Sequence, residues 1–379
     1  MMMKISIIKL LIILLIIFSL GSCNDAIFYK ITVEPPLVDP LIGGSPTNFV
    51  EYNNKLYVAS GRKIFSYGKN EESGNNEWSE WIILDSFVLN LAVAGDSFYA
   101  LYLSSNSGKI RRYYNGGNSS EEVNLSGNVQ SIHALDNFLF VSVRNSNNNI
   151  YKFYYKEEGA ADFNEISLEK TNSGPLDCMI KGVAFDITHY YLCTDYGIFC
   201  IDKSVPDFSS YSILAENYSL TGITNLNSDC VAAIAKNGRL CEISSAVISK
   251  EVSFGDSHYA TGALAVWRNE GTPTLLLVGR GEEYYSSTSS YSNGYLEIAL
   301  DTTGRILDGA AFIEPGKTQP TSIDDYDRYS PSLGKKLIYY IIQTPASIDE
   351  NMTMFASTSK SGLWSYRDHG EGITWNAEQ

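Results

Sequence analysis

The sequence predicts an all-β fold, a seven-bladed β-propeller of four-stranded antiparallel blades, preceded by an N-terminal segment that is not part of the fold. Three observations lead to this prediction. A pair of short apolar segments separated by a turn occurs seven times, the copies lie 40 to 68 residues apart, and no stretch after residue 23 keeps a helical period of 3.6 residues. Repeats of about 40 to 50 residues are typical of propeller blades or similar arrays.

Each pair of segments is expected to form a β-hairpin that supplies the two middle strands of one blade. Asn-Gly and other Gly-containing turns accept the positive φ that tight hairpins require. The pairs are residues 55–59 and 61–65, 98–102 and 108–110, 138–141 and 149–151, 190–194 and 197–199, 230–234 and 237–240, 275–278 and 293–296, and 354–357 and 362–364.

The segments that flank the hairpins predict the inner and outer strands. Small residues around an apolar centre suit an innermost strand, where backbones crowd around the axis; these segments are 90–92, 182–184, 222–224 and 262–264. Less regular segments are expected to form exposed outer strands; these are 81–84, 123–125, 166–168 and 212–214. Residues 374–376 are expected to be the outer strand of the last blade. Residues 31–33 either supply an edge strand to the first blade or complete the last one.

The N-terminus predicts a lipoprotein signal peptide. Residues 10–18 are an unbroken run of Leu, Ile and Phe, with Lys4 and Lys9 before it. A run this short is typical of a signal peptide rather than a membrane span. It ends in Leu-Gly-Ser-Cys at residues 20–23, which resembles the bacterial lipobox: an aliphatic residue, two small residues and the cysteine that receives the lipid. We expect cleavage before Cys23 and lipidation of its thiol; an ordinary signal peptide with a chance cysteine is the alternative.

The expected organisation is a signal peptide at 1–22, a lipidated N-terminus with a tether and a closing strand at 23–46, and the propeller at 47–379. The expected location is the cell envelope, with the lipid in a bacterial membrane and the propeller on the periplasmic or surface side. Without Lys4 and Lys9, 26 of the 28 basic residues face 43 acidic ones. Nucleic acid is therefore not an expected partner, because neutralising phosphates requires clustered Lys and Arg.

Taken together, the lipobox and the seven repeats resemble the β-propeller lipoproteins of bacteria, particularly the Asn-, Ser- and Tyr-rich kind of spirochaetes. The resemblance covers the lipobox and all of the repeats. It implies a location and an architecture, and it carries no catalytic signature.

Two polar insertions are the candidates for partner binding. One lengthens the sixth hairpin and the other joins the sixth and seventh blades, and in a propeller these two kinds of loop emerge on the same face. Tyr and Ser are typical of adaptable recognition loops, and Arg can pair with an acidic group. The candidates are Arg280, Tyr284, Tyr285, Tyr291, Asp324, Asp325, Tyr326, Arg328 and Tyr329. The alternative is a solvated insertion without a partner. The Asp cluster lacks the spacing of an EF-hand calcium site.

Five cysteines besides Cys23 lie in the middle of the chain. Cys193 and Cys200 flank a tight turn at residues 196–197 and would lie opposite each other if that turn is the hairpin loop. They form either a cross-strand disulfide or two stacked free thiols. The chain has no C-x-x-C and only four scattered histidines, so neither a metal site nor a cofactor is expected.

Two further features have both a functional and a structural interpretation. His133 and Lys181 fall on predicted innermost strands and can face the central channel, where a histidine is either a ligand or general base or only a hydrogen-bonded core residue. Residues 367–375 resemble a degenerate Asp-box, a turn between the third and fourth strands of sialidase blades. That turn is structural and does not imply glycosidase activity.

The preferred function is a binding or scaffolding module for a protein, peptide or glycan. The alternatives are a propeller hydrolase of the lactonase or sialidase kind, with its site at the channel mouth, and a structural subunit of an envelope complex. The sequence has no GxSxG and no metal-ligand pair, so an enzyme is the less favoured choice. Three or more Asp, Glu, Asn or His side chains converging at the channel mouth would favour an enzyme, and an aromatic rim would favour binding.

Overall fold

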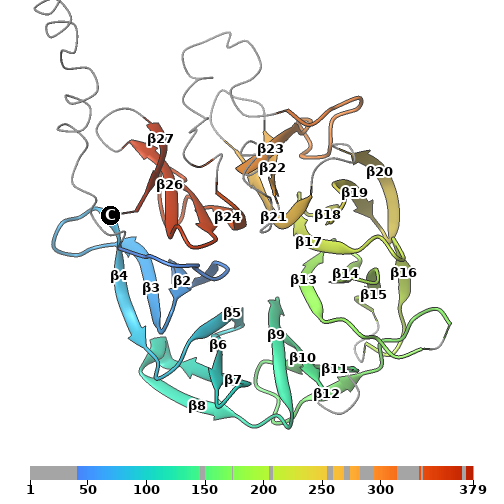
Figure 1. Ribbon diagram of the computed structural model, residues 1–379, viewed down its shortest axis with the longest axis horizontal. Helices are drawn as coiled ribbons and strands as arrows, with labels where there is room; N and C mark the ends of the chain where they lie inside the picture. Colours follow the sequence, from blue (N-terminus) through green and yellow to red (C-terminus); the bar gives the residue numbers. More distant parts are fainter. Residues whose placement is uncertain are drawn as a thin grey trace, which may run out of the picture. The chain divides into compact units, whose positions relative to one another are not determined.

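The computed structural model describes residues 41–145, 150–172, 174–204, 208–253, 259–268, 274–281, 294–313, 333, 336–368 and 373–378. Within these residues, 27 strands form seven antiparallel sheets, and helix is limited to short 3-10 turns such as η1 (Asn115–Gly117). The sheets stand around a common axis as the blades of a seven-bladed β-propeller, as predicted (Figure 1). The described part of the chain contains no helix with the length and apolar character needed to span a membrane.

Blades 1 to 4 each have four strands, which follow the chain from the axis outward. Blade 1 comprises β1 (Val50–Tyr52), β2 (Lys55–Ser60), β3 (Lys63–Lys69) and β4 (Asn76–Ile83). Blade 2 comprises β5 (Val88–Ala94), β6 (Ser97–Ser104), β7 (Ser107–Tyr114) and β8 (Ser119–Val123). Blade 3 comprises β9 (Asn128–Leu135), β10 (Phe138–Arg144), β11 (Tyr151–Glu157) and β12 (Asn164–Ile166). Blade 4 comprises β13 (Ile180–Phe185), β14 (His189–Thr194), β15 (Ile198–Asp202) and β16 (Ser212–Leu214).

Blades 5 to 7 complete the ring. Blade 5 comprises β17 (Leu220–Asn225), β18 (Val231–Ala235), β19 (Arg239–Ser244) and β20 (Val247–Ser253). Blade 6 comprises β21 (Ala260–Trp267), β22 (Leu275–Arg280) and β23 (Gly294–Ala299). In the described residues of this blade, two isolated bridges, Glu297 with Ile313 and Leu300 with Ile306, stand in place of a fourth strand. Blade 7 comprises β24 (Ile338–Gln343), β25 (Met354–Thr358), β26 (Leu363–Asp368) and β27 (Ile373–Ala377).

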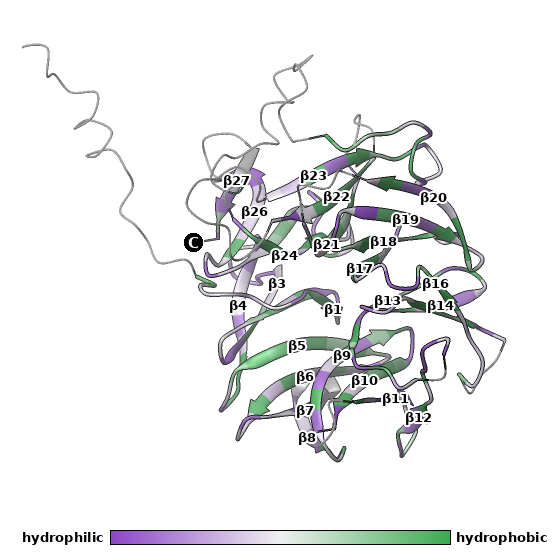
Figure 2. Ribbon diagram, turned by 45° about the vertical axis from the view of Figure 1, so that its right-hand side comes forward, coloured by the Kyte–Doolittle hydropathy of each residue, from purple (hydrophilic) through white to green (hydrophobic). Residues whose placement is uncertain are grey.

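The core is divided into seven apolar clusters among the described residues, one at each interface between neighbouring blades. Successive side chains of a strand point to opposite faces of its sheet, so each middle strand contributes to two clusters. In β6, Phe98, Ala100 and Tyr102 pack against blade 1, whereas Tyr99 and Leu101 pack against blade 3. Burial on both faces explains why the hairpin segments are continuous apolar runs in the sequence. In the outer strand β20, exposed and partly buried residues alternate instead, and the strand has both hydrophobic and hydrophilic stretches (Figure 2).

Because every blade repeats the same antiparallel meander around the axis, all innermost strands run in one direction. We name the face where these strands begin the top face, and the face where they end the bottom face. The top face carries the turns between second and third strands and the connections between blades. The bottom face carries the remaining turns, including the turn between β26 and β27, where the sequence predicted a degenerate Asp-box.

The ring closes by a peptide segment rather than by an exchanged strand. β27 is the outer strand of blade 7, as predicted, and β1 is the innermost strand of blade 1. Residues 42–47 lie between these two blades. The Leu363 amide donates to the Ile42 carbonyl (2.9 Å), and the Thr47 amide donates to the Ala59 carbonyl (2.8 Å).

The closing segment marks where the compact fold begins. Residues 42–46, the end of the segment 23–46 expected to hold the tether and a closing strand, lie in the compact unit, which spans Ile42–Glu378. Residues 31–33, Cys23 and the predicted signal peptide lie outside the described residues.

Buried carboxylates tie neighbouring blades together near the bottom face. Asp186 of blade 4 accepts hydrogen bonds from the Tyr191 hydroxyl (2.5 Å) and from the Ser245 amide of blade 5 (2.7 Å). Burial opposes ionisation of Asp186, but these hydrogen bonds, with those from His189 and Thr188, outweigh it and hold its pKa below the usual value. A carboxylate that stays charged and fully hydrogen-bonded is a strong link between sheets.

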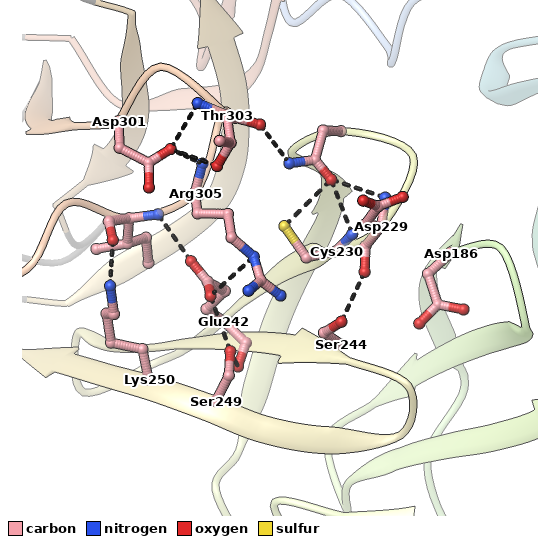
Figure 3. Close-up of polar contacts among 12 residues, drawn as sticks. Asp186, Asp229, Cys230, Glu242, Ser244, Ser249, Lys250, Asp301, Thr303 and Arg305 are labelled. Carbon is pink, nitrogen blue, oxygen red and sulfur yellow. Dashed lines mark hydrogen bonds and ion pairs between the residues drawn. The ribbon is translucent and has the colours of Figure 1, made fainter.

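Glu242 of β19 makes the corresponding link between blades 5 and 6 (Figure 3). Its side chain is buried. It accepts hydrogen bonds from the Ile306 amide (2.7 Å) and the Ser249 hydroxyl (2.8 Å), and Nε of Arg305 lies 3.7 Å away. The loop that follows β23 in blade 6 therefore contacts Glu242 of blade 5.

The fourth hairpin corrects the expected position of Cys193 and Cys200. Cys193 pairs with Ile198 and Cys200 pairs with Tyr191, so the two cysteines are not opposite each other, and both are free thiols. The turn lies one residue earlier than expected because the Thr194 hydroxyl accepts hydrogen bonds from the amides of residues 196 and 197 (both 3.2 Å). Burial raises the pKa of both thiols to about 12, which keeps them protonated and unreactive.

The outer strands of blades 2 and 3 are also displaced from the prediction. β8 ends at Val123 and β12 ends at Ile166, where the sequence predicted strands at 123–125 and 166–168. β8 pairs with β7 from Ser119 to Val123. Charge pairs accompany this ladder, with Lys109 Nζ 2.5 Å from Glu122 and Arg112 Nη1 3.1 Å from Glu121. An exposed strand has no apolar periodicity that would mark its position in the sequence.

The backbones of the innermost strands of blades 5 and 6 touch at a pair of glycines. A Cβ on Gly222 would lie 2.1 Å from the Gly262 carbonyl oxygen, and a Cβ on Gly262 would lie 2.3 Å from the Thr221 carbonyl oxygen. Gly262 also has a φ of +95°, which other residues rarely adopt.

We therefore predict that Gly262→Ala lowers the free energy of unfolding by about 2–4 kcal/mol, because the substitution adds both a steric clash and backbone strain. Gly61→Ala is the matched control. Gly61 has a φ of +60° but open space around it, so only the strain remains, about 1 kcal/mol. Urea unfolding of both variants measures the difference, and equal losses would contradict the close packing of these strands.

Candidate binding site in the central channel

A cavity of about 490 Å³ occupies the top half of the central channel. It is lined by residues at the beginnings of the innermost strands of blades 2 to 7. His133 and Lys181 both line it, as expected from the sequence. The cavity lies on the side of the propeller where the connections between blades emerge.

His133 is held as a link between blades 3 and 4. Its Nε2 lies 3.0 Å from the Ile180 carbonyl oxygen, so this nitrogen carries the hydrogen. The Ser131 hydroxyl donates to the same oxygen (2.8 Å), and the Ile180 amide donates to the Ser142 hydroxyl (3.0 Å). Burial lowers the pKa of His133 to about 4, despite the opposing hydrogen bond to Ile180. The structural interpretation of this histidine is therefore the better one.

Lys181 and the amide nitrogen of Asn90 also have partners, whereas Oδ1 of Asn90 is buried without a hydrogen bond in the described part of the chain. Lys181 Nζ lies 2.5 Å from Oδ1 of Asp195, which belongs to the turn between β14 and β15. The Asn90 amide donates to Oδ1 of Asn48 (2.9 Å). Among the described residues that line the cavity, Asn90 and His133 are the only Asp, Glu, Asn or His side chains.

The mouth of the channel is apolar and aromatic. Leu89 lines the cavity and is 41% exposed, and Phe87, two residues earlier in the connection from blade 1, is 60% exposed. Tyr339 and Tyr340 line the cavity from blade 7. Exposed apolar groups that gather in one place are typical of interaction surfaces.

Sequence reasoning did not identify these mouth residues. Leu89 and the two tyrosines belong to apolar runs that look like ordinary strands. Leu89 departs from the regular alternation because the pairing of β5 with β6 shifts in register between Val88 and Asn90, and this shift is visible only in the structure. Phe87 follows an Asp-Ser turn signal at residues 85–86. That signal was the one indication that its ring lies in a connection.

The structure places one of the predicted partner-binding residues. Arg280 is the last residue of β22 and only 5% exposed, so it lies within the blade rather than in the insertion. The others, Tyr284, Tyr285, Tyr291, Asp324, Asp325, Tyr326, Arg328 and Tyr329, lie outside the described residues. In the part of the chain that the structure describes, no three His, Cys, Asp or Glu side chains are arranged to hold a metal ion.

Comparison with solved structures identifies the same fold in proteins of low sequence identity. YCF48 from Cyanidioschyzon merolae is 12% identical, with a TM-score of 0.52 over 85% of this chain and 95% of that chain. A chain of the mitotic checkpoint complex is 10% identical, with a TM-score of 0.53 over 87% and 88%. YCF48 bound to D1 peptide is 10% identical, with a TM-score of 0.50 over 86% and 94%. Neither a protein-family model nor a curated protein sequence matches this chain.

The environment of His133 predicts a pH dependence of stability. Its folded pKa of about 4 lies below the value of about 6.5 for an exposed histidine, so the unfolded chain takes up this proton first. The stability that neutral His133 contributes is complete above pH ~6.5 and is lost as the pH falls towards about 4. We expect the advantage of the wild type over His133→Gln to shrink by at most about 1.4 kcal/mol per pH unit in this window.

Urea unfolding of wild type and variant on both sides of the histidine's unfolded pKa tests this expectation. All other titrating groups are common to both proteins. The difference between their free energies of unfolding therefore isolates the contribution of His133. A difference that does not change with pH would show that His133 titrates normally in the folded state.

Proposed function

We propose that this chain is a lipid-anchored lipoprotein of the bacterial cell envelope whose propeller binds a protein partner across its top face. The observation that carries the binding proposal is the channel mouth, where Leu89 and the tyrosines of blade 7 line one cavity and Phe87 is exposed two residues before Leu89. An apolar, aromatic rim around a concave centre suits a protein segment, because such groups supply most of the energy of protein interfaces.

The solved structure of YCF48 bound to D1 peptide offers a parallel for this use of a propeller. Its sequence is only 10% identical to this chain, so the parallel concerns the architecture and not particular residues. The predicted insertion loops, with Tyr284, Tyr285 and Tyr291 in one and Asp324 to Tyr329 in the other, join connections on the same face and would extend the proposed interface.

The proposal for the anchor rests on the lipobox and on the tether. Lipidation at Cys23 would leave 18 residues before Ile42, the first residue of the compact unit. Such a tether reaches at most about 60 Å when fully extended. The envelope location, on the periplasmic or surface side, follows from the same signal and depends on it.

The anchor is tested by substitution of the lipobox cysteine. We predict that Cys23→Ser abolishes the incorporation of labelled palmitate and moves the protein from the membrane fraction to the soluble fraction. Cys178→Ser is the control, since Cys178 is a partly exposed free thiol of the propeller. It should leave both measurements unchanged. Retention of the label in Cys23→Ser would contradict the proposal.

The binding face is tested by placing charges at the channel mouth. We predict that the double substitution Phe87→Glu and Leu89→Glu reduces recovery of a protein partner from envelope extract about tenfold or more, because two apolar contacts become unpaired charges. The bait is the chain that begins at residue 23 and carries Cys23→Ser. Partner bands are identified with the unmodified propeller and quantified for each variant.

The control places the same charges on the opposite face. Ile187 and Val247 are 68% and 61% exposed and lie at the bottom face, Ile187 in the turn between β13 and β14 and Val247 at the start of β20, so Ile187→Glu with Val247→Glu should leave recovery unchanged. Equal loss in both double variants would indicate nonspecific capture. Replacement of residues 282–292 by a short Gly-Ser turn tests the insertion separately. Unchanged recovery in that variant would remove Tyr284, Tyr285 and Tyr291 from the interface.

A further inference from the structure

A second cavity, of about 470 Å³, lies at the bottom face between blades 6, 7 and 1. It is formed by the end of β21, the loop between β24 and β25, the end of β26 and the turn between β3 and β4. It therefore lies at the interface where the ring closes, at the opposite end of the propeller from the channel mouth. Its size falls within the range of sites for small organic ligands.

Several polar groups that line this cavity are hydrogen-bonded to the buried carboxylate of Asp349. Oδ2 of Asp349 accepts hydrogen bonds from the Tyr67 hydroxyl (3.0 Å) and the Thr353 hydroxyl (2.6 Å), and Oδ1 accepts one from the Asn351 amide (3.0 Å). Burial opposes ionisation of Asp349, but these bonds and one from Asn76 prevail and hold its pKa below the usual value. The carboxylate is thus a fixed anchor for the loop that shapes the cavity.

The loop backbone carries strain next to this anchor. Met352 lines the cavity with a φ of +47°, a conformation that is rare for a long side chain. Its amide donates to the Asp349 carbonyl (2.9 Å). Strained positions of this kind persist where the surroundings determine them, and they cluster at ligand sites.

Two aromatic rings, Trp267 and Tyr366, also line the cavity. Trp267 from blade 6 packs edge-on against Tyr366 from blade 7, with ring centroids 5.7 Å apart at 79°. Tyr366 also contacts Trp375, at 5.6 Å. These contacts orient the rings before any ligand arrives, which lowers the entropic cost of binding.

The remaining lining is rich in side-chain amides. Asn75, Asn76, Gln343 and Asn351 all line the cavity. The Gln343 amide is already paired with the backbone of Arg268 (2.6 and 2.9 Å), and Asn76 hydrogen-bonds to Asp349. The amides of Asn75 and Asn351 each present a donor and an acceptor, and a hydroxyl group also both donates and accepts. A ligand with several hydroxyl groups is therefore the best match to this lining.

The charges of the cavity favour a neutral ligand. Arg367 lines it, but its Nη2 lies 2.8 Å from Oε2 of the buried Glu378. Asp349 is charged and surrounded by donors of the protein itself. Neither group leaves an uncompensated charge that would attract an anion or a cation.

From this combination we infer that the bottom cavity is a binding site for a neutral saccharide of one or two sugar units. The hydroxyl groups of the sugar exchange hydrogen bonds with Asn351, Asn75 and Asn76, and its C–H face packs on the ring of Trp267 or Tyr366. The site is independent of the protein-binding surface proposed for the top face. It joins residues from three blades and exists only in the closed ring.

The test is direct titration of the chain that begins at residue 23 and carries Cys23→Ser. The probes are glucose, galactose, N-acetylglucosamine, lactose and chitobiose, and binding is followed by calorimetry and by tryptophan fluorescence. We expect at least one probe to bind and to change the fluorescence. Asn351→Ala and Asn75→Ala should each weaken that binding about tenfold, the effect of removing one hydrogen bond from a bound ligand.

Asn164→Ala is the matched control, because Asn164 is an exposed asparagine on the outer strand β12 and does not line the cavity. It should bind the sugar as the wild type does. All three asparagines are exposed, so the variants are expected to fold, and circular dichroism checks this.

Three outcomes would overturn the inference. The first is that no sugar of the set binds at tens of millimolar. The second is that a sugar binds equally well to the wild type and to both cavity variants, which would place its site elsewhere. The third is that a neutral Gly-Ser peptide binds with the same dependence on Asn351 and Asn75 while no sugar does, which would assign the cavity to a peptide main chain.

Discussion

Burial of both faces of every blade is the constraint on which this propeller depends. In β14, Leu192 packs against blade 3 while Tyr191 and Cys193 pack against blade 5. A blade removed from the ring would expose two apolar faces, and a buried large side chain is worth about 1.5–3 kcal/mol each time it is covered. Stability therefore comes from interfaces between neighbours, as in other repeat architectures, and the last interface is as necessary as the first.

The last interface joins the first and last blades. Besides its apolar cluster, it contains several polar contacts. Residues 42–47 hydrogen-bond to blades 7 and 1, and Tyr67 reaches across to Asp349. Asp349 links two blades as Asp186 and Glu242 do elsewhere in the ring, and residues 42–47 add main-chain hydrogen bonds to this junction. The bottom cavity lies at this same junction. The cavity is therefore complete only when the ring is closed.

The two ends of the propeller differ in chemistry. At the top, His133 and Asn90 hydrogen-bond to neighbouring blades and Lys181 pairs with Asp195 of its own blade, while the exposed groups at the mouth are apolar. At the bottom, aromatic rings and side-chain amides surround a cavity whose charges are compensated within the protein. A surface of the first kind suits a protein segment and a cavity of the second kind suits a small polar molecule.

The sequence by itself determined the fold class, the seven hairpins and the strand β27, because tight turns and double-sided burial leave local patterns in the chain. It did not determine β8 and β12, whose exposed residues carry no such pattern, nor the register of Cys193 and Cys200, which depends on where the Thr194 hydroxyl caps the turn. Tertiary structure alone decided the candidate sites. Trp267, Asp349 and Asn75 are far apart in the chain, and only the radial packing of blades brings them to one cavity.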